Sequence, residues 1–255
     1  MGWDHTRAPH DSGVSNGANI ANVSDVSDVD PVDSDELDLE QWPRRAAFAF
    51  FRSFERPHFS LCTRIDVTAL RPALLQAGGA SLTLACHYAA LALANRLQPW
   101  RLRLIDGRVR VLRVVHISTT VLRADETFGF AHLLFADSFA RFAAPAAAAI
   151  AAAKTGADGF APRSSDQALL HGTTLPWIHF THFEHAQGGG AGDTIPKIAF
   201  GRIDTDSSGR AWLPLALQVH HALVDGLDVG RFVQAYEAAM REPLPWLQGG
   251  PLALG

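Results

Sequence analysis

Two adjacent histidines, His220 and His221, end an apolar run and are followed by Asp225 and Gly226 in the pattern HHxxxDG. A histidine can take up and return a proton near neutral pH if one ring nitrogen faces the substrate and the other is held in place. The end of a strand beside a tight turn offers that support. The alternative reading is a pair of core histidines, which need internal partners for their polar atoms. The whole pattern favours acid–base chemistry at His221.

The elements that must position this pattern follow from the periodicity of the chain. Strands and helices alternate irregularly and neighbouring strands look antiparallel, so we expect an α+β (mixed α/β) fold. The length suits one large domain, and the pattern predicts a single sheet. A tight turn is expected at Asp106 and Gly107. The expected helices are residues 42–54, 70–77, 81–97, 127–154 and 230–241, and the expected strands are residues 59–67, 100–106, 108–115, 176–185, 196–204 and 212–223.

Composition sets limits on the class of protein. The 255 residues are 47% hydrophobic and 19% charged, with a net charge of −4, which suits one globular domain without a nucleic-acid partner. Cys62 and Cys86 form no motif, so a reducing, cytoplasmic location fits. The longest apolar run, residues 143–153, is too short to cross a bilayer, and no signal-peptide pattern is present. We expect a soluble cytoplasmic protein that binds no membrane.

The chain divides into three parts. Residues 1–36 contain VSDVSDVDPVDSDELD, whose acids and few large apolar residues predict a disordered acidic leader. A partner-binding acidic tail is the alternative for this segment. Residues 37–243 form the expected domain, and residues 244–255 a C-terminal tail.

The HHxxxDG pattern is found in chloramphenicol acetyltransferases, dihydrolipoamide acyltransferases and condensation domains of peptide synthetases. The longer string QVHHALVDGLDVGRF resembles the chloramphenicol acetyltransferase version in particular. So do QWPRRAAFAFFRSFERPHFSLCTRIDVTAL, TTLPWIHFTHF and WLPLALQVHH, in the order and close to the spacing of that family. The resemblance covers about residues 37–243.

The resemblance implies an acetyl-CoA-dependent O-acetyltransferase in which His221 is the general base. In the family this ring is oriented by its own backbone carbonyl, and Asp225 forms a buried, structural pair with Arg44. Thr173 replaces the serine whose hydroxyl binds the oxyanion of the tetrahedral intermediate. A plain strand hydroxyl, with Thr174 misaligned, is the alternative reading of Thr173.

Further residues are implied at the two substrates. Phe50, Phe51, Phe183 and His185 match positions that bind the acceptor, and Trp177 matches the position near the cofactor, acetyl-CoA. Phe51 stands for a tyrosine and His185 for an apolar residue of the family.

Three other departures concern the same site. QGGGAGD, residues 187–193, replaces a largely apolar loop, and glycine brings flexibility with little contact area. Ala199 replaces a threonine and Asp228 a histidine. The acceptor is therefore chloramphenicol or another hydroxylated or aminated small molecule, and acyl chains other than acetyl stay open.

The family also implies a single-domain fold, a mixed β-sheet covered by helices, assembled as a homotrimer whose active sites lie between subunits. A biosynthetic acyltransferase that uses another acyl-CoA or a carrier-protein thioester is one alternative. A non-catalytic protein that binds an antibiotic or a CoA ester is another. His179, His182 and His185 are spaced by three, but on a strand the middle one points to the opposite face, so we expect no metal site.

Overall fold

In the computed structural model of the chain, residues 33–156 and 166–252 are described. These described residues all belong to one compact unit. Of the expected disordered leader, residues 1–32 therefore lie outside the described part of the chain, and only residues 33–36 lie within it.

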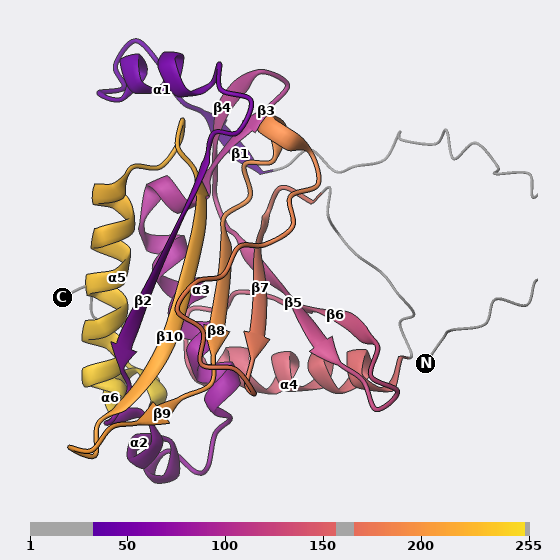
Figure 1. Ribbon diagram of the computed structural model, residues 1–255, viewed down its shortest axis with the longest axis vertical. Coiled ribbons are helices and arrows are strands. Elements are labelled where there is room, and N and C mark those ends of the chain that lie inside the picture. Colours follow the sequence, from indigo (N-terminus) through magenta and orange to yellow (C-terminus); the bar gives the residue numbers. More distant parts are fainter. Residues whose placement is uncertain (1–32, 157–165, 253–255) are drawn as a thin grey trace, which may run out of the picture. The chain divides into compact units, whose positions relative to one another are not determined.

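A seven-stranded mixed sheet forms the centre of this unit (Figure 1). Its order is β2-β10-β8-β7-β5-β6, with β9 paired to β10. The β5–β7 and β7–β8 pairs are parallel, and the other pairs are antiparallel, so the fold is mixed α/β as expected. The strands are β2 (His58–Asp66), β5 (His116–Leu122), β6 (Phe128–Leu133), β7 (Leu169–Leu175), β8 (Lys197–Gly201), β9 (Asp204–Thr205) and β10 (Ala211–His220).

Helices cover one face of this sheet. The α-helices are α1 (Arg45–Phe51), α2 (Leu70–Gln76), α3 (Leu82–Arg96), α4 (Phe139–Thr155), α5 (Gly226–Arg241) and α6 (Pro243–Leu247). Two short 3₁₀ turns, Gln98–Arg101 and Gly190–Gly192, complete the set. Behind the sheet in Figure 1 lie α3 and α5. Among the described residues, no helix combines the length and the apolar character that crossing a membrane requires.

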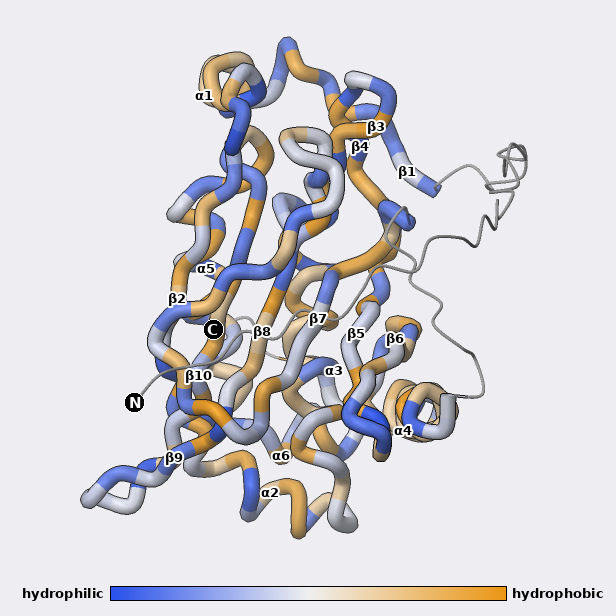
Figure 2. Tube along the Cα trace, turned by 45° about the vertical axis from the view of Figure 1, so that its right-hand side comes forward, coloured by the Kyte–Doolittle hydropathy of each residue, from blue (hydrophilic) through white to orange (hydrophobic). Residues whose placement is uncertain are grey.

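Alternate residues of the central strands serve two different cores, because side chains point to opposite faces in turn. Ile198 and Leu217 face the helices and belong to the large core. Ala199 and Ala216 face the other way and pack under Phe180, which comes from the link between β7 and β8. Figure 2 shows hydrophobic stretches along β8 and β10, whereas the turn between β9 and β10 is hydrophilic. The second face therefore remains available for a site.

A separate three-stranded sheet includes residues before 37, where we expected order to begin, so the ordered part of the chain starts earlier. Its order is β1 (Ser34–Glu36), β4 (Arg108–Leu112) and β3 (Leu102–Ile105). Asp106 and Gly107 have φ values of 50° and 76°, as the expected tight turn requires. Arg113 pairs with both Asp33 and Asp35, at 2.6 and 3.0 Å. Arginines on the hairpin thus neutralise acids that have no basic neighbour in the sequence.

Two expected elements are wrong. Residues 127–154 do not form one helix, because Phe128–Leu133 pairs along its whole length with β5 and the helix begins only at Phe139. Residues 176–185 form no strand, since the strand ends at Leu175. Pro176 has no N–H for a sheet ladder, and the chain leaves the sheet there. Beyond the expected domain, Trp246, Leu247 and Leu252 of the C-terminal tail are buried in the large core.

Candidate active site

The two adjacent histidines have different environments. His220 is buried, with Nε2 3.1 Å from the carbonyl of Ala191 and Nδ1 accepting from the Ala222 N–H at 3.2 Å. Burial lowers the pKa of His220 to about 4, which suits a neutral ring with one donor and one acceptor in use. His221 is about one-third exposed, and its Nδ1 has no hydrogen-bond partner among the described residues. Of the two histidines, His221 is therefore the one that a substrate can reach.

Arg44 fixes the turn that carries His221. Its Nε and Nη2 donate to the two carboxylate oxygens of Asp225, each at 2.6 Å. Nη2 also donates to the carbonyl of His221 at 2.9 Å, and Nη1 to that of Ala222 at 3.2 Å. Four bonds from one planar guanidinium therefore set the backbone geometry on both sides of the histidine.

The Arg44–Asp225 pair is present as expected, but it is only half-buried in this chain. The Arg44 side chain is 16% exposed and that of Asp225 is 36% exposed. The hydrogen bonds from Arg44 lower the pKa of Asp225 below its usual 3.8. Asp225 is also the N-cap residue of α5, and its N–H donates to Asp228 Oδ2 at 2.9 Å in the first turn of that helix. Asp228 thereby acquires a capping role at the helix start.

The His221 ring is oriented differently from the expectation. Its own carbonyl accepts from Arg44, and Nδ1 instead lies 3.3 Å from Asp225 Oδ1, without hydrogen-bond geometry. Phe51 stacks on the ring, with centroids 3.8 Å apart, and Phe59 packs at 4.8 Å. Phe50, 60% exposed, contacts Phe51 edge to face. Because Nδ1 faces Asp225, Nε2 occupies the far edge of the ring.

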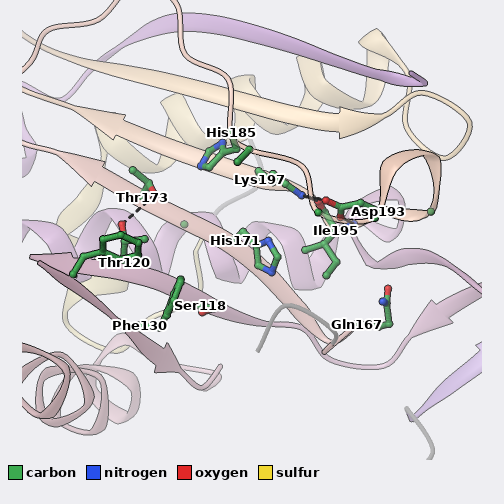
Figure 3. Close-up of a pocket in the computed structure, with 16 residues that line it drawn as sticks. Ser118, Thr120, Phe130, Gln167, His171, Thr173, His185, Asp193, Ile195 and Lys197 are labelled. Carbon is green, nitrogen blue, oxygen red and sulfur yellow. Dashed lines mark hydrogen bonds and ion pairs between the residues drawn. The ribbon is translucent and has the colours of Figure 1, made fainter. Parts of the chain in front are cut away.

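Thr173 lies elsewhere, in a cavity of about 550 Å³ on the helix-free face of the sheet (Figure 3). Its hydroxyl is 3.1 Å from that of Thr120 on β5. The cavity lining comes from β5, β6, β7, β8, the β7–β8 link and one residue before β7: Ser118, Thr120, Phe128, Phe130, Gln167, His171, Gly172, Thr173, His185, Ala186, Gly188, Gly189, Gly192, Asp193, Ile195 and Lys197. None of these described residues belongs to α1 or to the histidine pair.

One chain does not bring His221 and Thr173 together. Thr173 is in register with Ala199, and Ala199 with Ala216. His221 is two strands away and five residues further along β10, which places its Cα about 20 Å from that of Thr173. The residues expected to act on one substrate therefore form two half-sites, one around His221 and one around Thr173.

The glycine-rich segment is held more firmly than its composition suggests. His58 Nε2 lies 2.5 Å from the carbonyl of Asp193, and His220 binds the carbonyl of Ala191. Lys197, 3% exposed, forms a 2.6 Å ion pair with Asp193. The loop that walls the cavity is thus fastened from β2, β8 and β10, while its glycines leave the cavity open.

Comparison with known proteins now decides the family. The family model of chloramphenicol acetyltransferase matches residues 32–237. The chain belongs to the chloramphenicol acetyltransferase family. It is 30% identical to the chloramphenicol acetyltransferase of Streptomyces acrimycini over 213 residues, 83% of this chain and 96% of that one. It is 28% identical to chloramphenicol acetyltransferase 2 of Escherichia coli over 79% of this chain and 94% of that one.

Solved structures share the fold. A chloramphenicol acetyltransferase matches with a TM-score of 0.70 at 24% identity, over 80% of this chain and 98% of that one. The dihydrolipoamide acetyltransferase of Azotobacter vinelandii matches with a TM-score of 0.57 at 17% identity, over 91% and 98%. The chain is thus an acyltransferase of the chloramphenicol acetyltransferase family, whose members use acyl-CoA.

The remaining residues expected from this family divide between three places. His185 lines the cavity, and Phe183 packs against it and against Phe180. Ala199 is fully buried in the small core beneath the β7–β8 link. Trp177, 51% exposed, lies outside the cavity lining.

A second cavity of about 230 Å³ lies next to the Trp177 segment. Arg202 lines it and donates to the Trp177 carbonyl at 3.4 Å. Arg71 and Thr174 line it as well. Thr173 and its neighbour thus face different cavities, because consecutive strand residues point to opposite faces. Arg71 and Arg202 both bring positive charge to this second cavity, and Arg202 is paired with Asp204 at 3.0 Å.

Three residues at the Thr173 cavity were not expected from the sequence: His171, Lys197 and Gln218. His171 and Lys197 line it, and Gln218 Oε1 accepts from the His185 N–H at 3.1 Å. The sequence pattern that could have identified them is a polar residue at alternate positions of a strand that is otherwise apolar. No group of three described His, Cys, Asp or Glu residues is arranged to hold a metal ion. His179 and His182 lie beyond the end of β7, so they do not alternate between the faces of a strand as the sequence suggested.

Proposed function

We propose that the protein transfers the acetyl group of acetyl-CoA to a hydroxyl of chloramphenicol or a similar small molecule. The observation that supports this most is the His221 environment. Its ring is stacked on Phe51, Arg44 holds the turn that carries it, and its Nδ1 faces Asp225 at 3.3 Å, so Nε2 lies at the opposite edge of the ring. A positioned, exposed histidine of this kind is what proton transfer from an alcohol requires.

In the proposed reaction the acceptor hydroxyl attacks the carbonyl carbon of the acetyl thioester. His221 takes the hydroxyl proton as the new C–O bond forms. The tetrahedral intermediate carries a negative oxygen, and the Thr173 hydroxyl donates a hydrogen bond to it. Collapse breaks the C–S bond, and the protonated His221 returns its proton to the CoA thiolate. One hydroxyl donor of this type contributes ~3 kcal/mol of transition-state stabilisation.

The two half-sites support a homotrimeric assembly. A single chain leaves about 20 Å between the Cα atoms of His221 and Thr173, too far for both to contact one carbonyl group. In a closed ring each interface joins the same two different surfaces. We propose that the His221 half-site of one subunit, with Phe50 and Phe51, closes the Thr173 cavity of the next, with Phe183 and His185.

Acetyl-CoA is proposed to enter from the opposite side of the sheet, past Trp177. The second cavity supports this route, because the Arg71 guanidinium suits a phosphate of CoA, while Arg202 is paired with Asp204. Only the β7 backbone separates Thr174 in this cavity from Thr173 in the other. Acetyl-CoA is a cytoplasmic metabolite, so the proposed reaction takes place in the cytoplasm.

Release of free CoA thiol tests the proposal directly. Wild type and His221→Ala are mixed with acetyl-CoA, with and without chloramphenicol. Chloramphenicol-dependent release by wild type, lost by several orders of magnitude in the variant, supports it. Release only with other acyl-CoA esters or acceptors would indicate a biosynthetic acyltransferase. Binding of chloramphenicol without release, unchanged in the variant, would indicate a non-catalytic protein.

A further inference from the structure

Two imidazoles, His171 and His185, border the Thr173 cavity from different elements. His171 is on β7, two residues before Thr173, so the two side chains share one face of the sheet. His185 comes from the β7–β8 link, and Figure 3 shows both histidines at the same cavity. Both are polar residues of the cavity proposed to hold the acceptor, and neither has a role in the proposed acyl transfer.

His185 is held in place but leaves one ring nitrogen without a partner. Its backbone N–H donates to Gln218 Oε1 at 3.1 Å, and its ring meets Phe183 edge to face at 4.8 Å. Nε2 is buried and has no hydrogen-bond partner among the described residues. Buried polar atoms are nearly always hydrogen-bonded, so this nitrogen points to a ligand group that completes it.

The charges at this cavity cancel. Lys197 Nζ is committed to Asp193 Oδ2 at 2.6 Å and to the Ile195 carbonyl at 3.2 Å. The Asp193 carboxylate also accepts from the Ile195 N–H at 3.2 Å. The side chains of Lys197 and Asp193 are 3% and 11% exposed, so each charge is neutralised by the other within the protein. Neither is free to bind an ionic group of a ligand.

The two imidazoles are neutral at physiological pH. Burial lowers the pKa of His171 to about 4, and the Lys197 ammonium adds to the effect. The same two causes, burial first, lower the pKa of His185 to about 4. A neutral imidazole has one N–H donor and one acceptor nitrogen. It therefore matches a group that can itself donate and accept.

We propose that His171 and His185 form a subsite for a neutral hydroxyl or primary carboxamide of the acceptor. His171 is about 7 Å along the strand from Thr173, so this group lies well away from the reacting hydroxyl. Among the described residues that line the cavity, an anionic group finds no free cation, and an unsubstituted arene leaves His185 Nε2 unpaired. The inference rests on the proposed function, since it describes the acceptor of that reaction.

The test compares two acceptors that differ in one neutral group: 2-acetamido-1-phenylpropane-1,3-diol and its 4-carboxamidophenyl analogue. Affinity is measured by calorimetry with the full chain in the absence of acyl-CoA, and turnover by CoA thiol release. The proteins are wild type, His185→Leu, His185→Gln and, as a matched control, His182→Leu, whose histidine is 72% exposed.

Wild type and the control should bind the carboxamide about tenfold more tightly than the phenyl compound. His185→Leu should abolish this preference, because both compounds then bind equally, and His185→Gln, which keeps a donor and an acceptor, should retain part of it. Equal or absent binding of both compounds to wild type overturns the subsite, as does an equal loss for both in His185→Leu. A retained preference without thiol release from any acyl-CoA contradicts the proposed function and leaves the subsite standing.

Discussion

Phe51 and His221 stack face to face, with ring centroids 3.8 Å apart and ring planes inclined by 10°. The contact joins α1 to the end of β10, and it covers one face of an imidazole whose Nδ1 has no hydrogen bond. An aromatic face also attracts the protonated imidazole that forms during proton transfer. The stack therefore takes part of the orienting role that a hydrogen bond would otherwise have.

Replacement of this ring should slow the reaction. We expect Phe51→Ala to lower kcat by about tenfold, because the imidazole loses its fixed orientation. Phe51→Tyr keeps the stack and should stay close to wild type. Leu75→Ala, at a residue 73% exposed on α2, controls for a general effect of truncation. Thiol-release kinetics give the comparison, and an unchanged kcat in Phe51→Ala would refute an orienting role.

Arg44 should be irreplaceable by lysine. Arg44→Lys keeps the charge but cannot reproduce four bonds in one plane, so both Arg44→Lys and Arg44→Ala should lower kcat. Arg44→Ala should also reduce the free energy of unfolding by about 1–2 kcal/mol, which allows for the partial exposure of the pair. Urea denaturation measures this loss. The neighbouring Arg45→Ala, whose side chain is 58% exposed, should cost much less, and equal losses would contradict the assignment.

The lowered pKa of Asp225 predicts how stability depends on pH. A carboxyl whose folded pKa lies below its unfolded value stabilises the protein above the unfolded pKa, here 3.8. That contribution is lost as the pH falls through the folded pKa. The difference in unfolding free energy between wild type and Asp225→Asn should therefore be constant above about pH 5 and shrink in more acidic solution. Urea titrations at several pH values measure it, and a difference independent of pH would argue against this linkage.

Subunit mixing tests whether the half-sites belong to different chains. His221→Ala and Thr173→Ala should each be nearly inactive. If equal amounts are unfolded together and refolded, about a quarter of the sites combine an intact His221 with an intact Thr173 in a closed ring. Thiol release should recover accordingly. Mixing without refolding is the control, and no recovery after refolding would show that one chain supplies both residues.

Two truncations test the observed start of order. Removal of residues 1–32 keeps β1, whereas removal of residues 1–36 deletes it together with the carboxylates that Arg108 and Arg113 bind. We expect the longer deletion to lower Tm by several degrees, since 1 kcal/mol corresponds to about 2–4 °C in a domain of this size. Thermal unfolding at two salt concentrations should show a smaller gap at high salt. Identical Tm values would mean that β1 adds nothing to stability.

The local patterns predicted some parts of this structure well. The helix at Leu82–Arg96 and the β3–β4 turn could be predicted from the sequence, because the residues that specify each of them are neighbours in the chain. Arg44, His221 and Asp225 were expected because two separate strings, residues 41–70 and 218–232, resemble one family. These residues do lie together, as the hydrogen bonds of Arg44 show.

Other parts depend on pairing between distant segments. Phe128–Leu133 is a strand because β5 lies beside it, and no signal within its six residues separates it from the alanine-rich helix that follows. The polarity of the Thr173 cavity depends on register, which decides that His171 and Lys197 share a face. A single-residue shift would have buried both against the helices.

The two half-sites share no side chain. The Thr173 cavity is built from β5, β6, β7, β8 and their links, whereas His221 is supported from α1, β2 and the start of α5. Within one chain, substitutions that are far apart and have no common partner combine additively in their effect on stability. Evolution, or a protein engineer, can therefore change the lining of the cavity without loosening the support of His221 in the same chain.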